Sequence, residues 1–202
     1  MMLDFINTIL EHLAMTAAGV AIAVLIGTLA GIWISRKTAF AGPVLYIADV
    51  IQTIPSLALL AILMIVFGLG DLTVIIGLCL YSLLPVIRNT YTGLTAIPPS
   101  IREAARGMGM SSIQSLIKVE LPLAVPMILS GIRIAFVTAL GTAVIGVLIG
   151  SGGLGYIIYR GIQALDWGMI IEGTIPVVLL SLLAQYVFNK LQRLEKRRKI
   201  NV

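Results

Sequence analysis

The chain has 202 residues, of which 59% are hydrophobic and 11% are charged, and its mean hydropathy is +1.06. Soluble globular domains are about 45–50% apolar and about 25% charged, so this composition excludes an ordinary soluble domain and a disordered chain. The net charge is +5, but the basic residues lie between and after long apolar runs, which indicates membrane topology rather than nucleic-acid binding. With a single cysteine, Cys79, and a single histidine, His12, the chain has no internal disulfide and no basis for a metal centre built from several such ligands.

Five runs of the sequence are apolar enough to be membrane spans, because crossing a bilayer takes roughly 20 apolar residues. The predicted spans are 13–34, 44–67, 72–87, 123–149 and 170–188. The preceding segment, 1–12, is too polar for a secretory signal and predicts a short helix lying at the membrane surface. The sequence therefore predicts an all-α integral membrane protein with a single transmembrane domain over residues 1–202.

The basic residues indicate how these spans are oriented. Twelve of them fall on one side of the predicted membrane: Arg36, Lys37, Arg88, Arg102, Arg106, Lys118, Lys190, Arg193, Lys196, Arg197, Arg198 and Lys199. The other side holds only Arg160. Because five spans place the termini on opposite sides, the positive-inside rule predicts the N-terminus outside the cell and the C-terminus in the cytoplasm.

The segment 88–122, between the third and fourth spans, is too long for a turn and too polar to cross the membrane. Ser100 and Glu103 have the spacing of a capping box, in which each side chain binds a backbone N–H of the first helical turn. This spacing predicts a short helix that runs to about Met108. The segment is therefore expected to form a structured loop on the cytoplasmic face.

The end of that short helix and a second helix are also predicted within the loop. Gly107 or Gly109 can adopt the left-handed conformation that ends a helix. Ser111 and Gln114 repeat the capping spacing a few residues later. Together these signals predict a compact helix–turn–helix unit.

The loop also carries a gapped motif that resembles the EAA loop of ABC importer permeases. It consists of Glu103-Ala104-Ala105, then Gly109, then Val119-x-Leu121-Pro122, with Val119 in place of the family's usual Ile. The resemblance implies that the short helix is a coupling helix, which docks into a groove of a cytoplasmic ABC ATPase dimer. The residues assigned to this ATPase-coupling loop are Ser100, Arg102, Glu103, Ala104, Ala105, Arg106, Gly109, Leu121 and Pro122.

Simpler roles for three of these residues stay open at this point. Glu103 needs no partner protein if it only caps its own helix. Arg102 and Arg106 also need no partner protein if their positive charge serves only to keep the loop on the cytoplasmic side.

The resemblance extends over nearly the whole chain. The stretches 51–61, 83–94, 103–110 and 148–162 are similar to the osmoprotectant permeases for glycine betaine, carnitine, choline and proline, and the methionine permeases are the next nearest. This likeness implies the five-helix fold of type I, methionine-permease-like ABC importers. It also implies uptake of compatible solutes across a bacterial cell membrane, with transport of methionine or another amino acid as the alternative.

The same resemblance implies which partners the chain has. They are a second copy or a related permease, a cytoplasmic ATPase dimer, an extracellular or lipid-anchored solute-binding protein and the lipid bilayer, with no nucleic acid. Five spans that pack through small residues enclose little space, so the solute path is expected between two permeases. The outer segment 151–168 is the expected landing surface of the binding protein.

No nucleotide site is evident in the sequence. It contains no G-x-x-x-x-G-K-[S/T] motif, and the glycine-rich stretch 150–155 has no lysine. The chain is therefore expected to be a transport subunit and not an enzyme, without a cofactor of its own, while ATP and magnesium bind to the partner ATPase. A self-sufficient channel or secondary transporter is the alternative from another class, but it often shows inverted repeats, and none is evident.

Two ionisable residues, Asp49 and Arg133, lie inside predicted spans, where a charge costs at least about 2.5–3.5 kcal/mol. They are predicted to form an intramembrane ion pair, with snorkelling of Arg133 to the interface as the alternative. The polar residues around a proline in the second span are candidates for the translocation path, and helix–helix hydrogen bonds are the alternative. These residues are Gln52, Thr53, Pro55 and Ser56.

An aromatic cage for a quaternary ammonium group is not evident. The two tryptophans, Trp33 and Trp167, lie near span ends, as is typical of membrane interfaces. Solute selection is therefore expected to lie in the separate binding protein.

Overall fold

The computed structural model describes residues 2–200, and the side chains of residues 3–195. Within this range the chain is helical and has no β-strand. The α-helices are α1 (Met2–Arg36), α2 (Ala41–Thr53), α3 (Ser56–Phe67), α4 (Asp71–Thr95), α5 (Pro99–Gly107), α6 (Ser112–Ser115), α7 (Leu121–Ala143), α8 (Leu154–Ala164) and α9 (Trp167–Ile200). Three short helical turns join them, at Thr38–Phe40, Leu116–Glu120 and Val144–Ile149.

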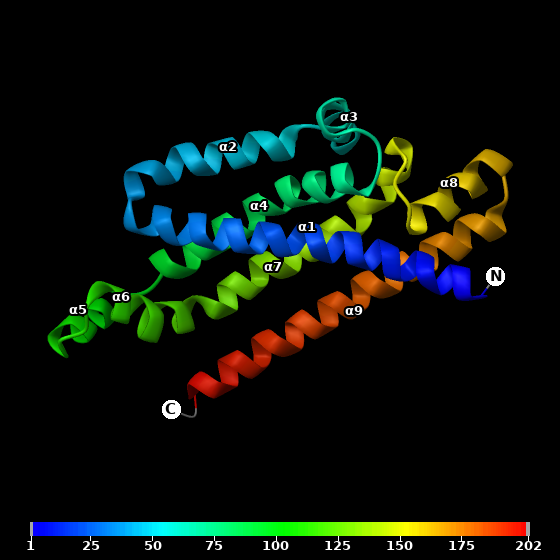
Figure 1. Cartoon of the computed structure of the whole chain (residues 1–202). Coiled ribbons are helices and arrows are strands. Elements are labelled where there is room, and N and C mark those ends of the chain that lie inside the picture. Colours follow the sequence, from blue (N-terminus) through cyan, green and yellow to red (C-terminus); the bar gives the residue numbers. More distant parts are fainter. Residues whose placement is uncertain (1, 201–202) are drawn as a thin grey trace.

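Four long helices, α1, α4, α7 and α9, run lengthwise through an elongated bundle (Figure 1). Helices α5 and α6 lie at one end, and α3 and α8 lie at the other, where the N-terminus is also found. We call the first of these the basic end, because it carries Arg36, Lys37, Arg102, Arg106 and Lys118. The polar loop and the N-terminus therefore lie at opposite ends of the bundle.

The length and composition of the helices support the predicted membrane spans. Four helical columns can cross a bilayer: Leu3–Arg36, Asp71–Thr95, Ser112–Ile149 and Trp167–Glu195. A fifth is formed if Thr38–Thr53 and Ser56–Phe67, which meet at an angle of 98°, count as one broken span. The all-α membrane fold is therefore as predicted, but the second span is bent.

The bend in the second span has a local cause. Ile54 leaves the helical conformation, with φ −67° and ψ 127°, directly before Pro55. A residue that precedes proline is driven out of the helical region by the proline ring, so α2 ends and α3 begins in a new direction. The segment predicted as the second span, 44–67, is therefore made of two helices joined at a bend and not of one straight helix.

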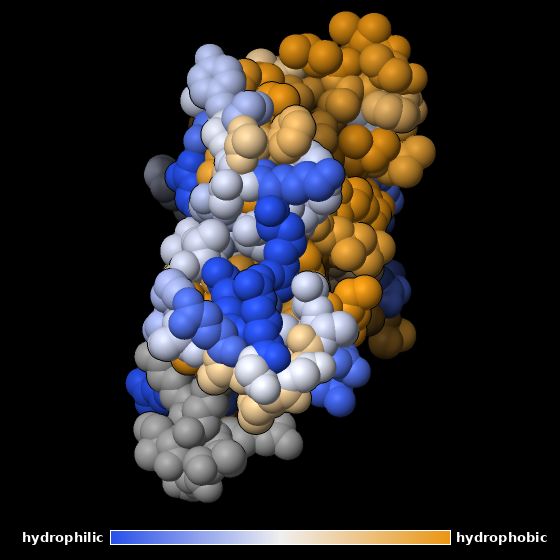
Figure 2. All heavy atoms as spheres, turned by 90° about the vertical axis from the view of Figure 1, so that its left-hand side faces the viewer, coloured by the Kyte–Doolittle hydropathy of each residue, from blue (hydrophilic) through white to orange (hydrophobic). Residues whose placement is uncertain are grey.

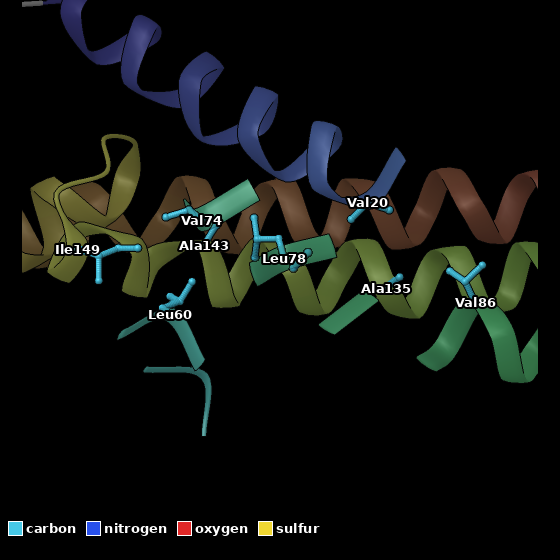
Figure 3. Close-up of a cluster of buried hydrophobic side chains, with 9 residues drawn as sticks. Val20, Leu60, Val74, Leu78, Val86, Ala135, Ala143 and Ile149 are labelled. Atoms are coloured by element: carbon cyan, nitrogen blue, oxygen red, sulfur yellow. The ribbon is translucent and has the colours of Figure 1, made fainter. Parts of the chain in front are cut away.

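The core lies between α1, α4 and α7 and is built from small and branched side chains. One cluster joins Val20, Leu60, Val74, Leu78, Val86, Ala135, Ala139, Ala143 and Ile149 (Figure 3). Glycines let these helices approach closely: a Cβ atom on Gly31 would lie 2.6 Å from Thr90, and one on Gly131 would lie 2.5 Å from the Pro85 carbonyl oxygen. Such contacts hold helices together in lipid, where the hydrophobic effect does not.

The first twelve residues do not form a separate surface helix, and that prediction was wrong. Residues 2–12 continue into the first span as part of α1. His12 is fully buried, with Nε2 3.1 Å from the Leu140 carbonyl oxygen, and the Glu11 carboxylate accepts a hydrogen bond of 3.0 Å from the Gly153 N–H. Contacts of Glu11 and His12 with distant segments therefore hold this segment against the bundle as the first part of α1.

The loop 88–122 is more helical than its composition predicts. Helix α4 continues past Arg88 to Thr95, and the helical column of the fourth span already begins at Ser112. Arg88 lies within α4, as suits a good helix former, and its Nη2 lies 2.6 Å from Oδ2 of Asp49 on α2.

Candidate functional site

Helix α5 begins with two prolines and not with a capping serine. Pro98 is the N-cap residue, and no side chain caps the helix. Pro99 occupies the first helical position, where its fixed φ suits the helix and its missing N–H is not needed. Ser100 consequently lies inside the first turn, so the predicted capping box with Glu103 is wrong. Both Ser100 and Glu103 are exposed.

The end of α5 depends on Gly109. The helix ends at Gly107, and Gly109 has a φ of +80°, the left-handed conformation predicted for either glycine. The Met110 N–H then donates a hydrogen bond of 3.1 Å to the Ala105 carbonyl oxygen. The turn thus needs a glycine at position 109, but Gly107 keeps an ordinary conformation.

The second predicted capping signal is confirmed. The Ser111 Oγ accepts a hydrogen bond of 3.2 Å from the Gln114 N–H, and the Gln114 Oε1 accepts one of 2.9 Å from the Ser111 N–H. The helix that this box starts, α6, passes through the turn Leu116–Glu120 directly into α7. The loop therefore presents one independent short helix, α5, followed by the base of a span.

The outer face of α5 is exposed and combines charged, small and apolar side chains. Ala105 faces inward and is buried, whereas Glu103, Ala104 and Arg106 are exposed. Met108 is 69% exposed. Hydrophilic residues gather over this end of the molecule (Figure 2). Exposed methionine and arginine side chains are of the types that are enriched in protein–protein interfaces, so this face is suited to docking against another protein.

A buried carboxylate, Glu120, ties α5 to the rest of the molecule. Its side chain is 2% exposed, and its Oε1 accepts hydrogen bonds of 2.8 Å from Nη2 of Arg36 and 3.1 Å from Oγ of Ser115. Its Oε2 accepts a hydrogen bond of 3.0 Å from Nε of Arg102, and Nη2 of Arg102 donates to the Leu94 carbonyl oxygen at 2.6 Å. One carboxylate thus connects α1 and α5 to the base of α7, and Arg102 extends the link to α4. We call these residues (Arg36, Arg102, Ser115 and Glu120) the Glu120 cluster.

The Glu120 cluster changes the interpretation of two predicted residues and adds one that sequence analysis missed. Arg102 points toward the bundle and binds Glu120, so it anchors α5. Arg106 is exposed on the outer surface and remains free to contact a partner. Glu120 occupies the variable position between Val119 and Leu121 of the motif. An acidic residue at that position, in a loop that is otherwise basic, was the signal from which the sequence could have predicted this ion pair. The final motif residues, Leu121 and Pro122, form the first turn of α7.

The predicted ion pair between Asp49 and Arg133 is not formed. Asp49 pairs with Arg88, and Nη1 of Arg133 donates a hydrogen bond to Oδ1 of Asn189 on α9. Asp49 on α2 finds its partner on α4, which packs against α2. Arg133 on α7 finds its partner on α9, which packs against α7. The two residues therefore bind different helices and not each other.

The four candidates for the translocation path surround the bend between α2 and α3. Gln52 donates a hydrogen bond of 2.8 Å to the Tyr81 carbonyl oxygen on α4, and Thr53 donates one of 2.7 Å to Val50 in its own helix. Gln52, Thr53 and Pro55 are exposed, and Ser56 is half-buried. Gln52 therefore makes a helix–helix hydrogen bond, which was the alternative to a role in the translocation path. The four candidate residues nevertheless remain accessible at the surface of the chain.

Comparisons with known proteins agree with this arrangement. The family of binding-protein-dependent transport system inner membrane components matches residues 23–201. The glycine betaine/carnitine/choline transport system permease protein OpuCD of Bacillus subtilis (strain 168) is 47% identical over 184 residues, which cover 91% of this chain and 80% of that protein. The carnitine transport permease protein OpuCD of Listeria monocytogenes serotype 1/2a (strain 10403S) is 45% identical, covering 91% and 82%.

A solved structure confirms the fold. A chain of the MetNI methionine ABC transporter, in an inward-facing conformation, superimposes with a TM-score of 0.85 at 25% identity, covering 96% of this chain and 97% of that one. The match over almost the full length of both chains supports the five-span, type I permease architecture. Together with the matched family, it shows that the chain belongs to the inner membrane components of binding-protein-dependent transport systems.

Proposed function

We propose that this chain is the permease of an ABC importer for compatible solutes such as glycine betaine, carnitine or choline, and that α5 couples it to a separate ATPase dimer. The main observation is the exposed Glu103-Ala104 face of α5, held rigidly at the basic end by the Glu120 cluster. The solute class is supported by the names of the relatives at 45–47% identity. Methionine is less well supported, because the methionine transporter chain is 25% identical.

The proposed mechanism uses two permeases and places the solute path between them. Each permease presents one α5 to the ATPase dimer, where ATP and magnesium bind. Closure of the ATPases would draw the two α5 helices together, and the Glu120 cluster would pass that movement to α1, α4 and α7. The residues around the bend at Pro55 remain candidates for the path. A loaded binding protein at residues 151–168 would favour the same state, since linkage between binding sites is reciprocal.

The coupling role of α5 is tested by paired substitutions. Glu103→Lys reverses a charge on the exposed face, and Gly109→Val places a branched side chain at a φ of +80°, which only glycine adopts readily. We expect solute uptake into cells to fall by about tenfold or more in both variants, at unchanged membrane levels, because docking interfaces depend on a few central residues.

The matched control for this test is Gly107→Ala. That position has open space and no positive φ, so uptake should stay near the wild-type rate. Normal uptake in both Glu103→Lys and Gly109→Val would contradict the assignment of α5 as the coupling helix.

The proposed orientation places the N-terminus outside and the C-terminus in the cytoplasm. The positive charge of the basic end supports it. Reporter fusions at Ile200 should be active only in a cytoplasmic assay, and fusions before Leu13 only in an external one. A C-terminal reporter that is active only outside would overturn both the orientation and the odd number of spans.

A further inference from the structure

Arg133 is a charged residue inside a span, and among the described side chains it has no carboxylate partner. It lies in α7, roughly 18 Å along the helix from Leu121 at 1.5 Å per residue. The ion pairs between described side chains are Arg36–Glu120, Arg102–Glu120 and Arg88–Asp49, so Arg133 is in none of them. Its hydrogen-bond acceptor is the neutral amide of Asn189. A guanidinium has five N–H donors, and this contact uses one nitrogen.

An open pocket of about 310 Å³ adjoins this guanidinium, between α7 and α9. It is lined by Arg133, Ile134, Val137, Thr138 and Gln185. The Thr138 hydroxyl already donates a hydrogen bond of 2.8 Å to the Ile134 carbonyl oxygen. The pocket therefore offers a ligand two donor groups, the Arg133 guanidinium and the Gln185 amide, and apolar walls from Ile134 and Val137.

This combination of groups suits one chemical class. A planar guanidinium binds carboxylates through two parallel N–H bonds, and a neighbouring amide can add a third donor. Exposing polar groups of a span to lipid costs free energy. Charged residues inside spans therefore usually line the path of a substrate or ion. Both the donors and their position indicate an anionic group of a small molecule that crosses the membrane.

We propose that Arg133 and Gln185 bind the carboxylate of the transported solute within the membrane. This inference rests on the proposed function and concerns one end of the solute. A cage for the quaternary ammonium group is absent from the sequence pattern, whereas the pocket offers donors for the carboxylate end. Glycine betaine and carnitine carry this carboxylate, whereas choline carries a hydroxyl group instead. The site is therefore expected to bind choline more weakly, while the choice of solute for uptake stays with the binding protein.

Binding is measured on the permease–ATPase complex in detergent, without binding protein, by saturation-transfer NMR with glycine betaine and with choline. We expect glycine betaine signals from the wild type and weak choline signals. Arg133→Gln should weaken glycine betaine binding about tenfold or more, and Arg133→Lys, which keeps the charge but not the bidentate geometry, should weaken it less.

Thr142→Val is the matched control. Thr142 lies on the same helix, outside the pocket lining, and its hydroxyl binds only the Thr138 carbonyl oxygen among the described contacts. Its replacement should leave glycine betaine binding unchanged. Absent glycine betaine signals in the wild type, equal choline binding, or unchanged glycine betaine binding in Arg133→Gln would each overturn the proposal.

The phosphate of an anionic phospholipid could bind the same donors as a carboxylate. Mass spectrometry of the same complexes shows whether the pocket holds a phospholipid or the solute. Loss of a bound anionic phospholipid from Arg133→Gln, with glycine betaine binding unaltered, would assign the pocket to lipid and reject the solute site.

Transport assays separate this proposal from the proposed function. In proteoliposomes that hold the complete importer, Arg133→Gln should reduce glycine betaine uptake but retain ATPase stimulation by loaded binding protein, because α5 and the Glu120 cluster are untouched. If the wild-type importer took up none of these solutes, the proposed function would be contradicted. Wild-type rates of glycine betaine uptake in Arg133→Gln would contradict only the carboxylate site.

Discussion

Replacing Glu120 with alanine is expected to destabilise the permease by about 3 kcal/mol and to uncouple transport from ATP hydrolysis. Removing one member of a buried ion pair usually costs about 3–5 kcal/mol, because the other charge stays behind without a partner. The lower end applies, since the side chains of Arg36 and Arg102 are 37% and 29% exposed and water screens them in part. Thermal unfolding in detergent measures the stability, and the ATPase response to loaded binding protein measures the coupling.

Two further variants separate the roles of the two loop carboxylates. Glu120→Gln keeps the shape and one acceptor oxygen but loses the charge, so its stability should fall between those of the wild type and Glu120→Ala. Glu103→Ala removes an exposed carboxylate and should change stability by less than about 0.5 kcal/mol while weakening uptake. If Glu120→Ala unfolded at the wild-type temperature with normal coupling, the Glu120 cluster would have no mechanical role.

Adding one methyl group at Gly131 is expected to have the second largest effect on the bundle. A Cβ atom there would lie 2.5 Å from the Pro85 carbonyl oxygen and 2.7 Å from Cβ of Asn89, both on α4. Neither atom is the end of a flexible side chain, so α4 and α7 must move apart. Such overpacking typically costs about 1–3 kcal/mol, which Gly131→Ala should show as a lower unfolding temperature in detergent.

Gly141→Ala on the same helix is the control for this prediction. No atom lies within 4 Å of a Cβ at Gly141, and alanine favours a helix over glycine by about 1 kcal/mol. The same chemical change should therefore stabilise the protein slightly at position 141 and destabilise it at position 131. Equal effects at both positions would show that α4 and α7 do not pack as closely as the structure indicates.

The features that the sequence alone determined are those that depend on composition or on neighbours a few residues apart. Long apolar runs predicted the spans that the helices form, and the distribution of lysine and arginine gave an orientation that stays a prediction. The spacing of Ser111 and Gln114 predicted a capping box that the structure contains, and the break at the left-handed Gly109 followed from the same local chemistry. The fixed spacing from Glu103 to Pro122 was sufficient to indicate the permease family that the matched relatives then showed.

Local spacing failed where two signals competed for one turn. Ser100 and Glu103 have the spacing of a cap, but Pro99 starts the helix one residue earlier and leaves Ser100 inside it. A proline with a fixed φ determined the helix start more strongly than a serine that could accept a hydrogen bond. Likewise, Pro55 divided a run that hydropathy alone joined into one span.

The tertiary structure alone decided which polar groups meet. Glu120 binds Arg36 across 84 positions, and Asp49 binds Arg88 across 39, whereas the sequence analysis predicted Arg133 as the partner of Asp49. Hydropathy reports how costly a buried charge is, but the partner that offsets this cost is chosen by the packing of helices against one another. Sequence therefore identified Asp49 and Arg133 as charges that needed partners but missed Glu120, and only the packing of the helices determined which partners each of them found.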